Sequence, residues 1–284
     1  MRWGDARRSD NVEDRRGGIG VGHIGIGGIV IALLLSWATG TNPLQMLGLV
    51  SQVEQGVSPP AATAPADTNN GANDPAVDFV RAILGDTEDT WGAIFQKAGR
   101  NYTAPHLVLF SGSVQSACGG ASAASGPFYC PEDQRVYLDL SFFQEMRAHL
   151  GGGGDFAQAY VIAHEVGHHV QNLLGISQKV SASHQDTSGA AGLSVRLELQ
   201  ADCLAGVWAN QAQQRHQWLD QGDIEQALNT ASAIGDDRLQ QQAQGTVTPD
   251  SFTHGTSVQR VRWFHAGFDS GDLKHCDTFG TQNL

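Results

Sequence analysis

Two histidines and a glutamate stand together at residues 164 to 168, in the order His-Glu-Val-Gly-His. On a helix, His164 and His168 share one face because they are four residues apart, and two imidazoles so placed can bind one zinc ion. Glu165, beside them, can take a proton from a water molecule at the metal, as in the H-E-x-x-H motif of zinc peptidases. The pentapeptide therefore predicts a metal, a base and a hydrolytic reaction.

The residues around the motif predict a buried helix, whereas the alternative is a polar helix face with two solvated histidines. Asp155 follows a glycine run and is a good N-cap, and Gly175 is suited to end the helix. Apolar or small residues recur between them at steps of three and four: Phe156, Ala159, Tyr160, Ala163, Gly167, Val170 and Leu174. We expect a helix over about 156–174, in which two histidines and a glutamate would be costly to bury without a function.

A zinc hydrolase also needs a third protein ligand and an open position for water. A second long helix is expected over about 193–214, and it carries Glu198 and Asp202 four residues apart on one face. We expect Glu198 to be the third metal ligand and Asp202 to accept a hydrogen bond from a ligand histidine. A solvated acidic helix edge is the alternative. The E-x-x-x-D spacing is that of gluzincins, and the third histidine of metzincins is absent.

One more histidine precedes a third expected helix, over about 257–267, for which Thr256 is a natural N-cap. His254 lies next to a glycine just outside this helix, where it could project into a cleft and donate to the oxyanion of a tetrahedral intermediate. An ordinary loop histidine is the alternative. Arg260 could serve either as an anchoring ion pair or as a contact for a substrate carboxylate, and both remain open.

Several further stretches accompany these motifs. They are Phe-Tyr-Cys-Pro at 128–131, Val-Tyr-Leu-Asp at 136–139, the residues 163–171 and 196–203, His-Gly-Thr at 254–256 with Gln259 and Arg260, and Cys-Asp-Thr-Phe at 276–279. Together they resemble the bacterial neutral zinc metallopeptidases (the YpfJ-like proteins), from about residue 75 to the C-terminus and also in the N-terminal segment. The resemblance implies a zincin-like fold and a peptidase, and it adds little about the substrate.

The first forty residues predict a membrane anchor. Residues 1–18 carry five arginines and four acidic residues, and 19–39 contain no formal charge and are rich in Val, Ile, Leu and Gly. About twenty such residues suffice to cross a bilayer as a helix. We expect 1–18 to be cytoplasmic, 19–39 to span the inner membrane once, and the rest to lie on the periplasmic or extracellular side. A cleaved signal peptide is the alternative.

After this span, residues 40–75 contain prolines, alanines and Asn-Gly steps that are typical of a flexible linker. We expect the catalytic domain over 76–284. Its apolar runs at 106–110, 128–130 and 135–139 read as strands. The predicted fold is α+β and zincin-like, with the active-site helix and the Glu-bearing second helix packed on a small β-sheet. The segment 128–138 could act as an edge strand that binds an extended substrate by main-chain hydrogen bonds.

The chain has four cysteines, an even number that agrees with an exported domain and predicts two disulfides, for which three pairings exist. Cys118 and Cys130 bracket a loop rich in Gly, Ser and Ala, so we expect this pair. Cys203 and Cys276 would then bond to each other and hold the C-terminus against the Glu198 helix.

The net charge of −12 argues against a nucleic-acid partner, since phosphate binding needs a basic surface. The sequence therefore predicts a membrane-anchored zinc metalloendopeptidase that acts on peptide or protein substrates. One zinc ion per chain would be held by His164, His168 and Glu198, with Glu165 as the general base. Two alternatives remain: a catalytically silent zinc-containing binding module at the cell surface, and an amidase that acts on a non-peptide cell-wall substrate.

Overall fold

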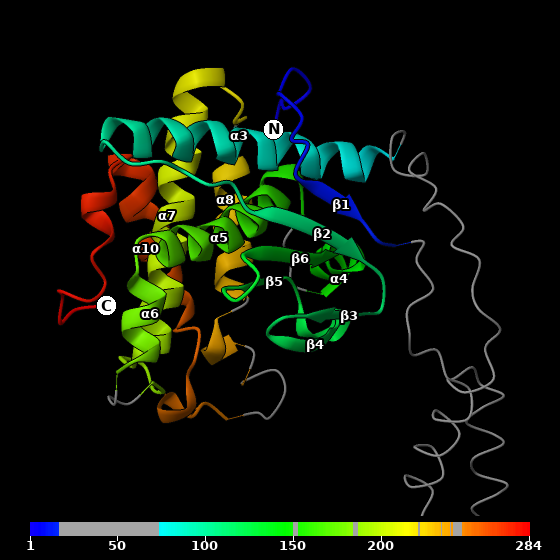
Figure 1. Cartoon of the computed structure of the whole chain (residues 1–284). Coiled ribbons are helices and arrows are strands. Elements are labelled where there is room, and N and C mark those ends of the chain that lie inside the picture. Colours follow the sequence, from blue (N-terminus) through cyan, green and yellow to red (C-terminus); the bar gives the residue numbers. More distant parts are fainter. Residues whose placement is uncertain are drawn as a thin grey trace, which may run out of the picture. The chain divides into compact units, whose positions relative to one another are not determined.

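A computed structural model describes most of the chain. The described residues are 1–16, 74–149, 153–183, 187–220, 222–233, 235–238, 240 and 246–284. They belong to one structural unit, which comprises Met1–Arg16 and Asn70–Leu284. Figure 1 shows this unit as an α+β arrangement in which one small sheet lies beside several helices.

The sheet has four strands in the order β1-β2-β6-β5. Strands β2 (His106–Phe110) and β6 (Arg135–Asp139) form its parallel centre, with Leu107 opposite Val136 and Leu109 opposite Leu138. These four side chains belong to the main core, whereas Val108, Phe110 and Tyr137 pack with Cys130 in a smaller cluster. Both faces of the central strands are therefore covered, which explains their continuous apolar sequence.

The two edges of the sheet differ. Strand β5 (Phe128–Cys130) pairs antiparallel with β6 at one edge, and β1 (Val12–Asp14) pairs parallel with β2 at the other. A separate hairpin of β3 (Ser113–Ser116) and β4 (Gly119–Ser122) follows β2. The Cys118–Cys130 disulfide joins the turn of this hairpin to the end of β5.

The helices pack around α5, which contains the His-Glu-Val-Gly-His motif. The elements are α3 (Pro75–Lys97), η1 (Ala123–Ser125), α4 (Ser141–His149), α5 (Asp155–Leu173), α6 (Ile176–Ser181), α7 (Leu193–His216), α8 (Asp223–Ala233), η2 (Pro249–Ser251), α10 (Ser257–Ser270) and η3 (Leu273–Cys276). Helix α5 begins one residue before the predicted start, and the chain after it turns at Gly175 with a left-handed φ of 75°. Thr256 caps α10 in a capping box with Gln259.

Glycines allow α7 to approach both of its neighbours closely. A Cβ atom on Gly167 of α5 would lie 3.0 Å from the backbone oxygen of Ala201 on α7. A Cβ atom on Gly267 of α10 would lie 1.9 Å from the backbone oxygen of Cys203, also on α7. These contacts bring the Glu198 helix against the helix that carries the histidines, and they bring α10 against α7 as well.

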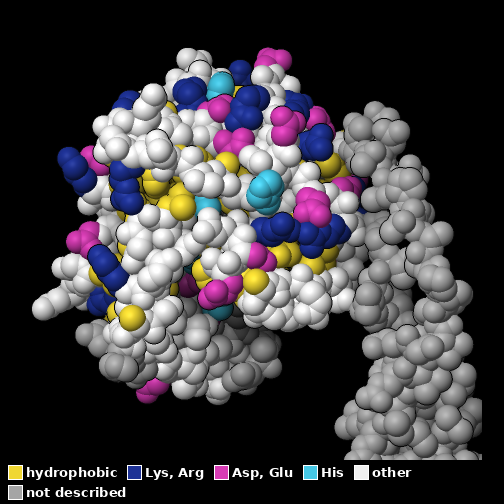
Figure 2. All heavy atoms as spheres, in the orientation of Figure 1, with side chains coloured by type: hydrophobic (Ala, Val, Ile, Leu, Met, Phe, Trp, Pro, Cys, Tyr) yellow, Lys and Arg dark blue, Asp and Glu magenta, His cyan; other side chains and the backbone are white. Residues whose placement is uncertain are grey.

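The N-terminal residues form part of this same unit. Strand β1 lies in the sheet, Arg16 pairs with Asp74 at 2.8 Å, and Arg8 pairs with Asp78 at 2.6 Å. Trp3 donates a hydrogen bond of 2.8 Å to Asp155, the first residue of α5. On the face shown in Figure 2, basic and acidic side chains are correspondingly interspersed.

This arrangement corrects the prediction of a single-pass membrane protein with a cytoplasmic N-terminus. Strand β1 lies in the sheet, and residues 1–16 belong to the same structural unit as the rest of the fold, so they lie on the same side of any membrane as that unit. Three of the arginines that suggested a cytoplasmic end, Arg7, Arg8 and Arg16, instead bind acidic residues of α3 and its N-cap. Within the described ranges, no helix has the length and apolar character needed to cross a membrane. The expected helix 19–39 and the linker up to residue 73 lie outside the described residues.

Candidate active site

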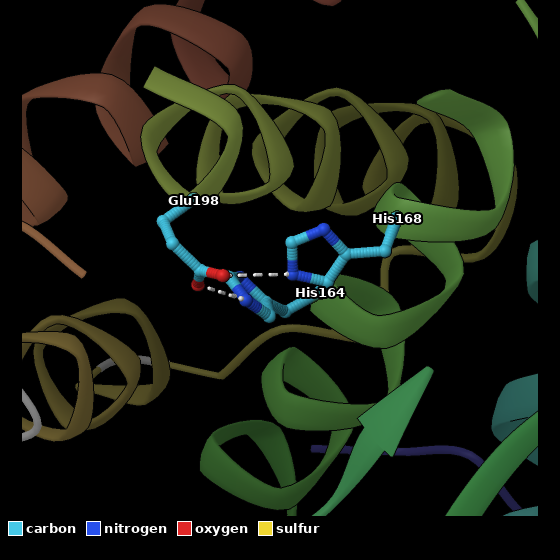
Figure 3. Close-up of side chains that lie close together, drawn as sticks. All are labelled: His164, His168 and Glu198. Carbon is cyan, nitrogen blue, oxygen red and sulfur yellow. Dashed lines mark hydrogen bonds and ion pairs between the residues drawn. The ribbon is translucent and has the colours of Figure 1, made fainter. Parts of the chain in front are cut away.

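Three potential metal ligands converge between α5 and α7. His164, His168 and Glu198 each offer one ligand atom, and these atoms all lie within 4.8 Å of one another. Nε2 of His164 lies 3.2 Å from Oε2 of Glu198, and Nε2 of His168 lies 3.4 Å from Oε1 of the same carboxylate. Figure 3 shows both imidazole rings directed toward Glu198.

This geometry fits a zinc ion. Two imidazole nitrogens and one carboxylate oxygen are a donor set of catalytic zinc sites. Ligand atoms bound tetrahedrally at 2.0–2.1 Å would be about 3.3 Å apart. The two nitrogen–oxygen distances above, one to each oxygen of Glu198, are close to that spacing, and all three ligand atoms lie within 4.8 Å of one another. The three residues can therefore hold the metal once their side chains move closer around it.

Asp202 orients the first histidine. Its Oδ1 lies 2.9 Å from Nδ1 of His164, and because an ionised carboxylate only accepts, the ring proton resides on Nδ1. Nε2 faces Glu198, and it is the nitrogen that can bind a metal once it gives up its own proton. Asp202 is fully buried, and Arg260 donates to it from Nε and Nη2 at 2.9 Å each. Burial opposes the charge of this carboxyl, but Arg260 and His164 lower the pKa of Asp202.

The partners of Asp202 include one residue whose role the sequence left open and one that it missed. Arg260 is 2% exposed and forms an ion pair with Asp202, which is an anchoring contact, and it also lines the cleft beside the ligands. The Tyr160 hydroxyl also donates to Asp202 and lies 3.2 Å from Nη2 of Arg260. Tyr160 precedes His164 by four residues, so its position on the same face of α5 was the signal available in the sequence.

Gln171 orients the second histidine and was not identified from the sequence. Its side-chain oxygen lies 2.9 Å from Nδ1 of His168, and its amide donates to the backbone oxygen of Leu197 at 2.7 Å. The same amide lies 3.1 Å from the side-chain oxygen of Gln200. Gln200 in turn donates to the backbone oxygen of Cys276, next to the Cys203–Cys276 disulfide. Each of the two histidines thus has a polar side chain at Nδ1, the ring nitrogen that does not face Glu198.

The charges of the cluster are complementary to a cation. Burial alone would lower the pKa of His164, but Asp202 and Glu198 raise it to about 10. Burial would raise the pKa of Glu198, but His168 and His164 keep it well below its ordinary value. Because the carboxylates favour positive charge at the imidazoles, protons and a metal ion compete for the same positions, and metal binding releases protons.

A cleft of about 610 Å³ opens over these ligands. Glu165 lines it beside His164 and His168, and burial raises the pKa of the Glu165 carboxyl. Its other walls include Phe128 and Tyr129 of β5. The side chain predicted to act as the base therefore faces the space next to the ligands.

His254 also lines the cleft, although it comes from the loop before α10. Asp236 holds this loop: its Oδ2 accepts backbone hydrogen bonds from Thr253, His254 and Gly255 at 2.7, 2.6 and 3.0 Å. Its Oδ1 lies 3.3 Å from Nδ1 of His254, and this contact raises the pKa of the imidazole. Asp236 was missed because it lies eighteen residues earlier in the chain, in no recognisable motif.

Both disulfides join the expected cysteines, Cys118 with Cys130 and Cys203 with Cys276. The second bond connects Cys203 of α7, five residues beyond Glu198 in sequence, to η3 near the C-terminus. It stabilises the helix that carries the carboxylate ligand by constraining the unfolded chain.

Comparison with known proteins assigns the family. The profile of the family described as "Putative neutral zinc metallopeptidase" matches residues 1–279. The chain belongs to this family. YpfJ of Escherichia coli strain K12 is 51% identical over 291 aligned positions, which cover 99% of each protein. Mb2605 of Mycobacterium bovis and Rv2575 of Mycobacterium tuberculosis strain H37Rv are each 46% identical over 216 positions, covering 72% of this chain and 73% of the relative. No solved structure matches the chain.

These findings confirm the resemblance drawn from the motifs. The family implies zinc and, at a coarse level, a zinc peptidase, and the His164, His168 and Glu198 cluster can bind a metal ion. The match begins at residue 1, in agreement with the packing of the N-terminal residues in the same unit.

Proposed function

We propose that this protein is a zinc endopeptidase in which His164, His168 and Glu198 hold one zinc ion and Glu165 is the general base. The observation that supports this most strongly is the convergence of the three ligand atoms within 4.8 Å, beside a fourth acidic side chain in a cleft. A structural zinc site is closed by four protein ligands and has no need of a base.

Zinc at this position supplies a Lewis acid, which lowers the pKa of a water molecule and polarises the scissile carbonyl. Glu165 accepts the proton of the attacking water and delivers it to the leaving amine. Its carboxyl is only 8% exposed, and a raised pKa brings its proton affinity closer to neutral pH, as suits a group that both takes and returns a proton.

The surrounding residues hold the ligands in place. Asp202 keeps the proton of His164 on Nδ1, and Gln171 binds the equivalent nitrogen of His168. Arg260 compensates the buried charge of Asp202. Without that ion pair, the carboxylate would be costly to bury and would lose its charge.

We assign His254 the stabilisation of the oxyanion. Its Nδ1 faces Asp236, so Nε2 is the nitrogen available to the cleft. Asp236 favours the protonated imidazole, which donates more strongly to developing negative charge than a neutral ring does.

The substrate would lie extended along β5. This strand pairs with β6 on one side only, and its residues Phe128 and Tyr129 line the cleft. A peptide could therefore add a strand by main-chain hydrogen bonds, which bind many sequences because they do not depend on side chains. Peptides and proteins are the substrates that this edge favours.

The decisive experiment measures metal content and cleavage of a mixed decapeptide library by the full chain, wild type beside Glu165→Gln. We expect about one zinc per chain in both proteins and cleavage by the wild type alone. Absence of zinc from both proteins would overturn the metal assignment.

The same preparations distinguish the alternatives. Zinc in both proteins, with release of amines from peptidoglycan fragments but not from the library, would replace the peptidase by a cell-wall amidase. Zinc in both proteins without hydrolysis of either material would favour a binding module. Full activity in Glu165→Gln would exclude this residue as the base.

A further inference from the structure

A buried polar relay connects the edge strand to the helix that carries the metal ligands. It consists of Asn172 and His169 on α5, Tyr129 on β5, and the backbone oxygen of Thr103 in the segment that leads into β2. The Tyr129 hydroxyl lies 3.0 Å from Nδ1 of His169, and Nε2 of His169 lies 2.7 Å from the oxygen of Thr103. Asn172 donates to the Tyr129 hydroxyl at 3.0 Å. The His169 side chain is fully buried.

Chemistry determines the direction of every bond in this relay. A backbone oxygen can only accept, so His169 carries its proton on Nε2 and donates to Thr103. Nδ1 of a neutral ring is then an acceptor, and the Tyr129 hydroxyl donates to it. The tyrosine oxygen accepts from Asn172. Each of these three hydrogen bonds therefore has a defined donor and acceptor, and a network of this kind favours one arrangement of its elements.

The position of the relay links it to the site. His168 and His169 are neighbours about 100° apart around α5, so one points toward Glu198 and the other toward the sheet. Tyr129 belongs to β5 and also lines the cleft with Glu165 and His168. His169, the residue next to the proposed ligand His168, is thus hydrogen-bonded to the sheet region at two points. These are Tyr129 on the edge strand β5 and Thr103 just before β2.

We infer that His169 and Tyr129 are positioning residues that set the place of the substrate-binding edge β5 relative to Glu165 and the metal ligands. This inference rests on the proposed function, because it assigns β5 the role of binding the peptide main chain. Main-chain hydrogen bonds between β5 and a peptide form in the ground state and the transition state alike, so a less firmly held edge strand weakens both and raises KM with little change in kcat.

The chain offers a closely matched pair of variants. Tyr129→Phe removes one oxygen from the relay and retains the ring, whose edge contact with His169 has a centroid distance of 5.4 Å. Tyr102→Phe makes the same change in a second tyrosine that contacts His169 edge-on, at 5.9 Å. The buried Tyr102 hydroxyl has no hydrogen-bond partner among the described residues, so this control loses no polar contact.

The test compares kcat and KM for a decapeptide that the wild type cleaves and for its short form, with one residue on each side of the scissile bond. For Tyr129→Phe we expect KM for the decapeptide to rise about tenfold, with kcat within about twofold and zinc content unchanged. The short form should lose less, because it forms few main-chain bonds with β5. Tyr102→Phe should behave as the wild type with both substrates.

A second readout is independent of activity. Hydrogen exchange of the backbone amides in β5 should be faster in Tyr129→Phe than in the wild type and unchanged in Tyr102→Phe. Wild-type kinetics together with wild-type exchange in Tyr129→Phe would overturn the positioning role. An equal loss on long and short substrates, through kcat, would also overturn it. If the wild type cleaves no peptide, the proposed function fails, and the exchange measurement still tests the link between β5 and α5.

Discussion

Asp202 on α7 and His164 on α5 are joined by a hydrogen bond of 2.9 Å between Oδ1 and Nδ1. Four residues earlier on α7, Glu198 lies 3.2 Å from the other nitrogen of the same ring. One imidazole is therefore held between two carboxylates of one helix face. Glu198 is the carboxylate with which it could bind a metal ion, and Asp202 is the one that orients it.

The first prediction concerns Asp202→Asn. The amide lacks the charge that keeps the His164 proton on Nδ1, so we expect zinc affinity to fall by about 10- to 100-fold. Loss of the ion pair with buried Arg260 should also lower the melting temperature. Competition with a chelator measures the affinity. Asp236→Asn is the control, because Asp236 contacts no proposed ligand, and equal zinc affinities in the two variants would contradict the orienting role.

The second prediction concerns His254. Its replacement by alanine should lower kcat by roughly 100-fold or more with little change in KM or zinc content, as expected for a group that acts on the oxyanion. Steady-state kinetics and metal analysis test this. A change confined to KM would instead indicate a contact with bound substrate.

The third prediction is the pH dependence that Asp236 imposes on His254. The hydrogen bond with Asp236 raises the pKa of His254, so the imidazole stays protonated to higher pH than an ordinary histidine. If the protonated ring is the donor, kcat falls as the pH rises through this raised pKa. In Asp236→Asn the fall should move to lower pH. An unshifted profile in this variant would show that another group titrates.

The fourth prediction tests the close contact of α10 with α7. A Cβ atom at Gly267 would overlap the backbone oxygen of Cys203, so Gly267→Ala should destabilise the protein by about 3 kcal/mol. Gly92→Ala in α3 is the control, because no atom lies within 4 Å of its added Cβ atom. That change should be neutral or stabilise by up to about 1 kcal/mol. Urea unfolding measures both, and similar stabilities would contradict the predicted contact.

The fifth prediction concerns acid and the N-terminal residues. Hydrogen bonds from Arg16 lower the pKa of Asp14 and of Asp74 despite partial burial, and Arg8 does the same for Asp78. A carboxyl with a depressed folded pKa contributes stability that is present above its unfolded pKa, about 3.9 for Asp. This contribution is lost as the pH falls through the folded value.

Arg16→Gln should therefore lower the free energy of unfolding at pH 7 by less than about 1 kcal/mol for each partly exposed pair, and the melting temperature with it. The difference from the wild type should shrink as the pH falls below the unfolded Asp pKa of about 3.9. Arg147→Gln, at an exposed position of α4, is the control. A melting temperature at pH 7 equal to that of the wild type would mean that these pairs do not anchor the N-terminal residues.

Local sequence patterns were enough to predict those helices and strands whose defining residues lie close together in the chain. The spacing of His164 and His168, the apolar period around them and Gly175 predicted α5 to within one residue at each end. Glu198 and Asp202 were recognised as a pair because helical periodicity alone places residues four apart on one face. The resemblance to the family then indicated that the two helices contribute to one site. The strands β2, β5 and β6 lie at the expected apolar runs.

The N-terminal prediction failed because its partners are distant. The arginines of residues 1–16 have the composition of a membrane-flanking segment, and only the fold reveals that Arg8 and Arg16 face Asp78 and Asp74, beyond fifty intervening residues. The rule that places positive charge in the cytoplasm counts charges and contains no information on tertiary pairing.

By itself, the sequence predicted three helices (α5, α7 and α10), the types of the proposed metal ligands and the family, because these depend on residue identity and on short-range periodicity. Only the tertiary structure showed which partner each functional side chain contacts: Arg260 contacts Asp202, Asp236 contacts His254, and Tyr129 contacts His169. It also showed that β1 belongs to the sheet. Such contacts join residues far apart in the chain. How the elements pack sets these contacts. Helices that approach closely at glycines such as Gly167 and Gly267 can pack in few ways, and the packing then determines which side chains meet.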